Sequence, residues 1–115
     1  MATPLSGVSL DRQVALSRVG GDVQLLKEIA VLFLEDYPKS LTALHEAVAG
    51  GDAKAVERAA HSLKGSVANF GAAAAFESAR SIEESARAQR LAEVDPMIVR
   101  LEQALATLQH ELKAL

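Results

Sequence analysis

Along residues 91–115, apolar side chains recur at alternating spacings of three and four positions. The residues that make this pattern are Leu91, Val94, Ile98, Leu101, Leu105, Leu108, Leu112 and Leu115. Because an α-helix completes a turn in about 3.6 residues, this spacing places all of them on one face. Asp95 and Pro96 fit either as the N-cap and first residue of this helix or as part of its first turn, where proline is tolerated. A pattern of barely three heptads favours a seam within one helical bundle over a coiled coil between chains.

Glycine pairs divide the preceding sequence into further helices. Gly20-Gly21 and Gly50-Gly51 each precede an aspartate, which predicts that one helix stops there and that Asp22 or Asp52 caps the next. The second helix is therefore predicted to run from Asp22 to about Ala49, with apolar residues at Leu26, Ile29, Phe33, Tyr37, Leu41, Leu44 and Val48.

Other signals place the remaining helices. Residues 9–19 are predicted to form a short first helix with Ser9 as its N-cap. The third helix should end near Asn69, with Gly71 in the left-handed position that closes a helix. Pro38 is expected to kink the second helix, because proline removes a backbone hydrogen bond. An alanine-rich fourth helix is predicted over about 72–88, with an inner stripe of Ala72, Phe76, Ala79, Ile82 and Ala86.

These patterns predict an all-α fold. We expect an antiparallel up-down four-helix bundle with a short N-terminal capping helix, formed by residues 9–115 as one domain and preceded by a disordered lead at residues 1–8. The longest apolar run, residues 29–34, has six residues, far short of the roughly 20 that a membrane-spanning helix needs. The N-terminus shows no signal-peptide pattern and the chain has no cysteine, which favours a cytoplasmic location.

Composition argues against several functions. The sequence has twelve basic and fifteen acidic residues and few aromatic ones. Proteins that bind nucleic acids present basic surfaces with aromatic side chains that stack on bases, so we expect no nucleic-acid binding here. The sequence has no phosphate-binding glycine loop, so we expect no ATP chemistry and no enzyme activity of its own. His45 and His110 lack metal-ligand spacing and are predicted to be surface residues, so no metal site is expected. A monomer is expected.

The segment around His61 departs from this plain helical pattern. If His61 is set at zero on a helical wheel, Val56, Leu63, Val67 and Phe70 fall at roughly 180° to 240°. Glu57, Arg58, Gly65 and Ala68 fall within roughly 60° of His61. The histidine is therefore predicted to face solvent, opposite the core, with Lys64 and Gly65 beside it on the next turn.

This combination suits a chemical role. A neutral imidazole is a nucleophile and proton acceptor near physiological pH. Lys64, expected to be exposed, would neutralise an incoming phosphoryl group. Gly65 would leave room for a partner, and a glycine within a helix costs roughly 0.5–1 kcal/mol relative to alanine. A single exposed histidine is more often an ordinary surface residue, so the whole combination carries the argument.

The run from His61 to Ala72, His-Ser-Leu-Lys-Gly-Ser-Val-Ala-Asn-Phe-Gly-Ala, resembles the signature of histidine-containing phosphotransfer (HPt) domains. Phe33 to Pro38, Gly50 to Asp52 and Ile82 to Glu84 resemble other parts of that family. The resemblance covers nearly the whole chain. It implies a phosphoryl carrier in a two-component phosphorelay, in which His61 accepts the group from one receiver-domain aspartate and passes it to another.

The resemblance also implies the roles of the neighbouring residues. Lys64 would assist electrostatically and Gly65 would provide clearance. The family often carries a glutamine near Glu83 that bonds the histidine ring, and a glutamate could also hold an imidazole N–H. We expect Glu57, Arg58, Ala68 and Glu83 to contribute to partner binding. The partners implied are receiver domains and a hybrid histidine kinase, with Mg²⁺ bound by the receiver and no cofactor on this chain.

Two alternatives remain open from the sequence. The bundle could be a docking module that binds a receiver or kinase without being phosphorylated. It could also be the substrate domain of a chemotaxis-type histidine kinase.

Overall fold

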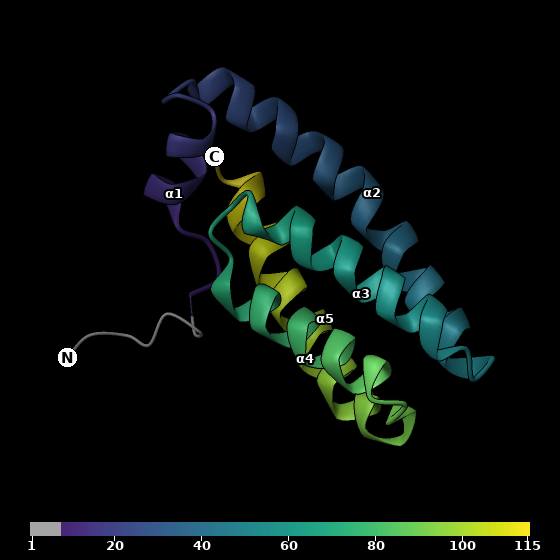
Figure 1. Cartoon of the computed structure of the whole chain (residues 1–115). Coiled ribbons are helices and arrows are strands. Elements are labelled where there is room, and N and C mark those ends of the chain that lie inside the picture. The colour runs from purple at the N-terminus through teal and green to yellow at the C-terminus, as the bar shows by residue number, and fades with distance from the viewer. Residues whose placement is uncertain (1–7) are drawn as a thin grey trace.

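The computed structural model describes residues 8–115, and this range is helical throughout apart from short connections. The elements in order are α1 (Arg12–Arg18), α2 (Val23–Ala49), α3 (Ala53–Ala68), α4 (Ala73–Arg87), the 3-10 turn η2 (Leu91–Glu93) and α5 (Val94–Lys113). Helices α2 to α5 form the antiparallel up-down bundle and α1 caps one end, as predicted (Figure 1). Of the disordered lead expected at residues 1–8, residues 1–7 lie outside the described residues.

Aspartate side chains begin three of the helices. Asp22 and Asp52 accept hydrogen bonds from backbone N–H groups in the first turns of α2 and α3, at 3.0 and 3.1 Å. The prediction that Ser9 caps α1 is wrong, because Asp11 takes that position and its carboxylate accepts from the Val14 N–H at 3.1 Å. The Asp11 N–H also donates to the carbonyl of Phe70 at 2.9 Å, which fixes where the chain turns into α1.

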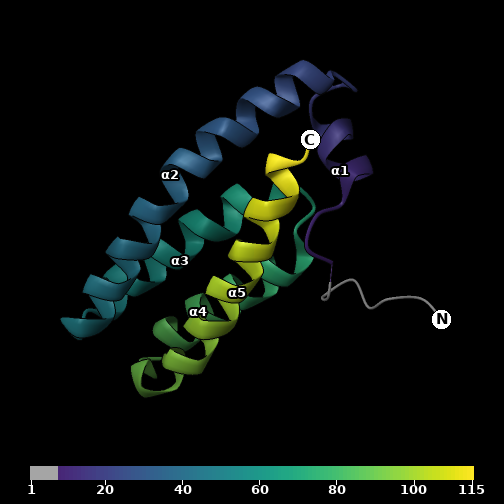
Figure 2. The same ribbon diagram turned by 180° about the vertical axis from the view of Figure 1, so that it is seen from behind.

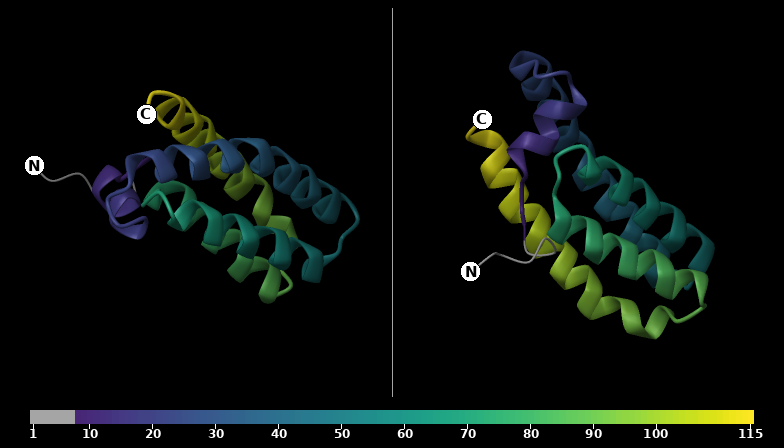
Figure 3. Two further views of the ribbon diagram at one scale, coloured as in Figure 1. Left: turned by 90° about the horizontal axis from the view of Figure 1, so that it is seen from above. Right: turned by 60° about the vertical axis from the view of Figure 1, so that its left-hand side comes forward.

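The segment before α1 is tied to the turn between α3 and α4. The Val8 carbonyl accepts a hydrogen bond from the Ala74 N–H at 2.9 Å, close to the Asp11 bond to Phe70. Figure 3 shows α1 at the end of the bundle where the C-terminus of α5 lies. Gly71, at φ +58°, makes the turn after α3, as its predicted left-handed position requires.

Two features of the longer helices bear on the predictions. Pro38 lies inside α2, and the helix continues on both sides of it from Val23 to Ala49. Pro96 lies in the first turn of α5, which begins at Val94, so that the second of the two placements expected for proline is confirmed.

The core lies between α2, α3, α4 and α5, and α2 runs along one side of the bundle (Figure 2). Small side chains on α4, including Ala75 and Ala79, are fully buried and let its neighbours pack closely. The apolar stripe of α5 is buried from Val94 to Leu112, whereas Leu91 in η2 and Leu115 are half-buried. The core holds α3 and α4 firmly side by side, and these two helices carry the residues described next.

Candidate functional site

His61 lies on the outward face of α3, and its side chain is 68% exposed. Leu63 and Val67, on the opposite face of the helix, are buried in the core, as the helical wheel predicts. Apart from the neighbouring residues and backbone of its own helix, a Cβ atom added at Gly65 would meet no atom of residues 8–115 within 4 Å. The imidazole and the glycine one turn later therefore form an open surface that another molecule can approach.

Glu83 reaches this surface from α4 and holds the histidine from beneath. Its Oε2 lies 2.6 Å from Nδ1 of His61, and its Oε1 lies 2.6 Å from Nζ of Lys64. A carboxylate can only accept hydrogen bonds, so Nδ1 of His61 carries the proton and donates it. The lone pair of a neutral ring then resides on Nε2.

The charge state of Glu83 follows from opposing effects. Burial of its side chain, which is 4% exposed, would by itself raise the pKa of the carboxyl group. The hydrogen bonds from Lys64 and His61, together with their charges, outweigh burial and bring the pKa of Glu83 below its ordinary value. Glu83 is therefore a carboxylate at neutral pH.

Lys64 is less accessible than the sequence predicts. Its side chain is 22% exposed because it extends from α3 toward α4, where Nζ bonds Glu83 and lies 6.0 Å from the centre of the Phe76 ring. Its ammonium group nevertheless lies within the same cluster as His61, since both bond the one carboxylate.

The structure adds Arg87, which sequence reasoning missed. Its Nε donates to Oε2 of Glu57 on α3 at 2.9 Å, and its Nη2 lies 3.6 Å from Oε2 of Glu83. The spacing of four residues between Glu83 and Arg87 on one helix was the available signal. The pairing with Glu57 depends on how α3 and α4 pack, which the sequence does not reveal.

The other expected partner-binding residues lie around this cluster. Glu57 and Arg58 line a shallow depression beside His61, together with Lys54, Ser62, Glu83 and Arg87. Ala68 is half-buried two turns further along α3. Glu83 lies at the floor of the depression rather than on its surface, so its contribution to a contact passes through the histidine that it holds.

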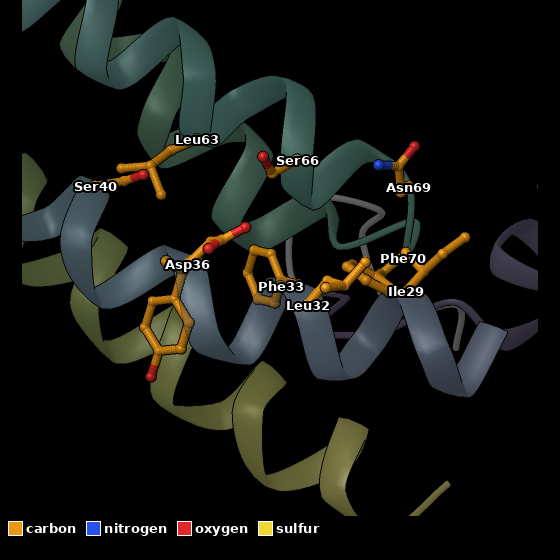
Figure 4. Close-up of a pocket in the computed structure, with 10 residues that line it drawn as sticks. Ile29, Leu32, Phe33, Asp36, Ser40, Leu63, Ser66, Asn69 and Phe70 are labelled. Carbon is orange, nitrogen blue, oxygen red and sulfur yellow. The ribbon is translucent and has the colours of Figure 1, made fainter. Parts of the chain in front are cut away.

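A pocket of about 170 Å³ lies between α2 and α3. Figure 4 shows Asp36 and Ser40 from α2 on one side of it and Leu63 and Ser66 from α3 on the other. A second depression shares Ser40 and continues to Ser62, the residue after His61. Four large apolar residues of α2 are exposed, namely Val23, Leu25, Val31 and Leu32, and Leu32, at 59%, also lines the pocket between α2 and α3.

Two other findings concern the range 8–115. None of its helices is both long and apolar enough to cross a membrane. No three histidine, aspartate or glutamate side chains within it converge as a metal site requires. His45 and His110 are both exposed.

The site therefore consists of an exposed imidazole on a helix face, held through Nδ1 and with its Nε2 turned away from Glu83. The family model described as "Hpt domain" matches residues 28–111. The chain belongs to this family, whose domains carry phosphoryl groups in two-component signalling.

Solved structures agree with this assignment. The histidine-containing phosphotransfer protein B (HptB) of Pseudomonas aeruginosa PAO1 is 30% identical, with 94% of each chain covered and a TM-score of 0.87. The HPT domain of a sensor hybrid histidine kinase from Shewanella is 19% identical, with 96% of this chain and 94% of that chain covered and a TM-score of 0.80. This second likeness shows that the two chains share a fold. No curated protein sequence matches this chain.

Proposed function

We propose that His61 is the phosphoryl carrier of this domain and that it relays the group between two receiver-domain aspartates. The observation that supports this most is the bond from Nδ1 of His61 to Glu83, which leaves the Nε2 lone pair on an exposed ring. The alternatives of a docking module without phosphorylation and of a kinase substrate domain use the same surface. They differ in whether His61 takes a phosphoryl group, and from what donor.

The transfer needs little from this chain beyond position and charge. Nε2 attacks the phosphorus of a receiver phosphoaspartate, an N–P bond forms, the acyl P–O bond breaks and the aspartate leaves as a carboxylate. The proton on Nδ1 stays with the ring and its bond to Glu83. The second transfer reverses these steps toward another aspartate, and the Mg²⁺ that neutralises charge is brought by the receiver.

Lys64 supplies the positive charge on this side of the reaction. Its Nζ already lies in the His61–Glu83 cluster, so that a rotation of the side chain brings the ammonium group toward a phosphoryl group on Nε2. An ammonium is a compact charge on a flexible stem and suits such a movement. Gly65 leaves the approach to the ring open.

The receiver would contact the surface from His61 to the boundary between α2 and α3. This surface is continuous, because the depression beside His61 shares Ser62 with a second one, and that one shares Ser40 with the pocket between α2 and α3. Leu32 and Leu25 add exposed apolar area on α2, which protein contacts favour at their centres. Arg58 and Glu57 would lie at the rim.

A phosphotransfer experiment tests the proposal. A receiver that binds the chain is labelled with ³²P on its aspartate and mixed with wild type or with His61→Gln in the presence of Mg²⁺. We expect acid-labile, alkali-stable label on the wild type alone. A wild type that binds the receiver and stays unlabelled would support the docking module instead. Label that appears only with ATP and a kinase catalytic core would support the kinase substrate domain.

A further inference from the structure

Arg87 lies between two carboxylates that differ in their access to water. Its Nε donates a hydrogen bond to Oε2 of Glu57 at 2.9 Å, and its Nη2 forms a longer ion pair with Oε2 of Glu83 at 3.6 Å. The side chain of Glu57 is 27% exposed, whereas that of Glu83 is 4% exposed. The side chain of Arg87 is 61% exposed, so that its guanidinium has room to move between them.

Lys64 cannot form close contacts with both Glu83 and a phosphoryl group on His61 at the same time. In the structure its ammonium group is the cation in direct hydrogen-bond contact with Glu83 among residues 8–115. A phosphoryl group on Nε2 of His61 would carry nearly two negative charges and attract the same ammonium. If Lys64 turned toward it, Glu83 would be a buried carboxylate with no cation in hydrogen-bond contact, and its remaining ion pair would be the 3.6 Å contact with Arg87.

We propose that Arg87 is a positioning residue that exchanges partners when His61 is phosphorylated. It pairs with Glu57 in the unphosphorylated domain and closes the gap to Glu83 as Lys64 turns to the phosphoryl group. Glu57 is then released to water, which its partial exposure allows. This inference rests on the proposed phosphorylation of His61.

The geometry suits an arginine in this role. The guanidinium presents five N–H donors in a planar fork, so that one group can hold two carboxylates or change between them. Its Nη2 already points toward Oε2 of Glu83, the oxygen that also accepts from His61. The exchange therefore keeps Glu83 charged and its bond to Nδ1 intact, which holds the ring in position while Nε2 carries the phosphoryl group.

A double-mutant cycle isolates this role. The four proteins are wild type, Arg87→Gln, Glu83→Gln and the double variant, each brought to equilibrium with a phosphorylated receiver. We expect Arg87→Gln to lower the ratio of phosphorylated to free His61 by about fivefold, the change expected for loss of a partly exposed ion pair. In the Glu83→Gln background the same substitution should have no effect, because a neutral amide needs no counter-charge.

Two further variants sharpen the result. Arg80→Gln is the matched control, because Arg80 lies on the same helix and pairs with Glu77 and Glu84 instead. Glu57→Gln should raise the fraction of His61 that phosphoramidate, a donor that needs no receiver contact, phosphorylates, since Glu57 competes for Arg87. A loss with Glu57→Gln equal to that of Arg87→Gln would overturn the exchange, because it would show that a fixed Glu57–Arg87 pair is what matters.

A small-molecule donor separates this inference from the proposed function. Phosphoramidate can phosphorylate an exposed histidine without a receiver, and ¹⁵N NMR of the His61 ring reports which nitrogen is modified and whether Nδ1 remains hydrogen-bonded. If neither donor phosphorylates His61, the proposed function fails. If His61 is phosphorylated but Arg87→Gln has no effect, or has the same effect with and without Glu83→Gln, the role given to Arg87 fails and the proposed function stands.

Discussion

At the scale of single residues, Glu83 ties stability to pH. Its lowered pKa means that the folded state favours the carboxylate more than the unfolded chain does. The stabilisation is complete above the ordinary glutamate value of about 4.3 and is lost as the pH falls through the lower folded-state value. We expect the melting temperature of wild type to fall relative to that of Glu83→Gln as the pH drops from 5 to 3.

Circular dichroism melts at several pH values measure this difference. Glu35→Gln is a suitable control, since it removes an exposed carboxylate from α2 and should follow the wild-type curve. Parallel curves for wild type and Glu83→Gln would show that the ion pairs of Glu83 do not contribute to stability.

Substitutions at Gly65 distinguish a role in partner approach from a role in folding. Its Cβ position is open among the described residues and its φ lies outside the left-handed region. We therefore expect Gly65→Ala to stabilise the domain by about 0.5–1 kcal/mol, because alanine favours the helix. Gly65→Gln should fold equally well and slow transfer from a receiver, because its side chain obstructs the approach to His61. Thermal melts and transfer rates of both variants are the measurement, and rapid transfer by Gly65→Gln would refute the role of clearance.

Helical spacing alone accounts for much of the predicted site. It places His61, Lys64 and Gly65 on one outward face, because their positions relative to one another depend on a single helix. It could not show that Lys64 extends into the boundary with α4, or that Glu83 is buried there. It missed Arg87 for the same reason, since the contact with Glu57 joins two helices whose relative position is set by core packing.

At the scale of elements, Gly71 controls how α1 meets the bundle. Its φ is +58°, and a Cβ there would lie 2.6 Å from Cβ of Asp11 and 3.0 Å from Cβ of Val14. Gly51 has a similar φ of +67°, but a Cβ there would meet no described atom within 4 Å. Gly71→Ala should therefore lose more stability than Gly51→Ala, which should lose about 1–2 kcal/mol from backbone strain alone.

Urea unfolding of the two alanine variants provides the comparison. Equal losses would mean that α1 moves aside at little cost and does not depend on close contact with the turn after α3. A larger loss in Gly71→Ala identifies the contact of α1 with this turn as the source of the difference.

Capping chemistry explains why most helix ends were predictable and one was not. Glycine followed by aspartate marks the starts of α2 and α3 locally, and both are confirmed. Near α1 the sequence offers two capping residues, Ser9 and Asp11. The choice between them is made by a long-range hydrogen bond, from the Asp11 N–H to the carbonyl of Phe70, which no local pattern contains.

At the scale of the whole molecule, one core should make unfolding a single transition. The buried residues form one cluster that spans all five helices. Leu105 of α5 is fully buried, so Leu105→Ala should lose about 2–5 kcal/mol. Val99 on the same helix is 53% exposed, and Val99→Ala should change the free energy of unfolding by less than about 0.5 kcal/mol.

The same unfolding experiment tests whether the transition is cooperative. Far-UV circular dichroism follows all the helices, while fluorescence of Tyr37 follows the contact between α2 and α5, where its hydroxyl bonds Gln109. We expect the two signals to change together in wild type and in both variants. Separate transitions would show that α2 detaches before the rest of the bundle unfolds.

The exposure of His61 also affects how partners are told apart. A histidine that is 68% exposed on an outward helix face can be approached from many directions, by one partner protein at a time. Because the ring is not enclosed in a pocket, its immediate surroundings do not exclude non-cognate proteins. For a carrier of this kind, specificity for its partners comes from how well the surrounding surface fits them. The Nε2 atom itself does not distinguish one partner from another.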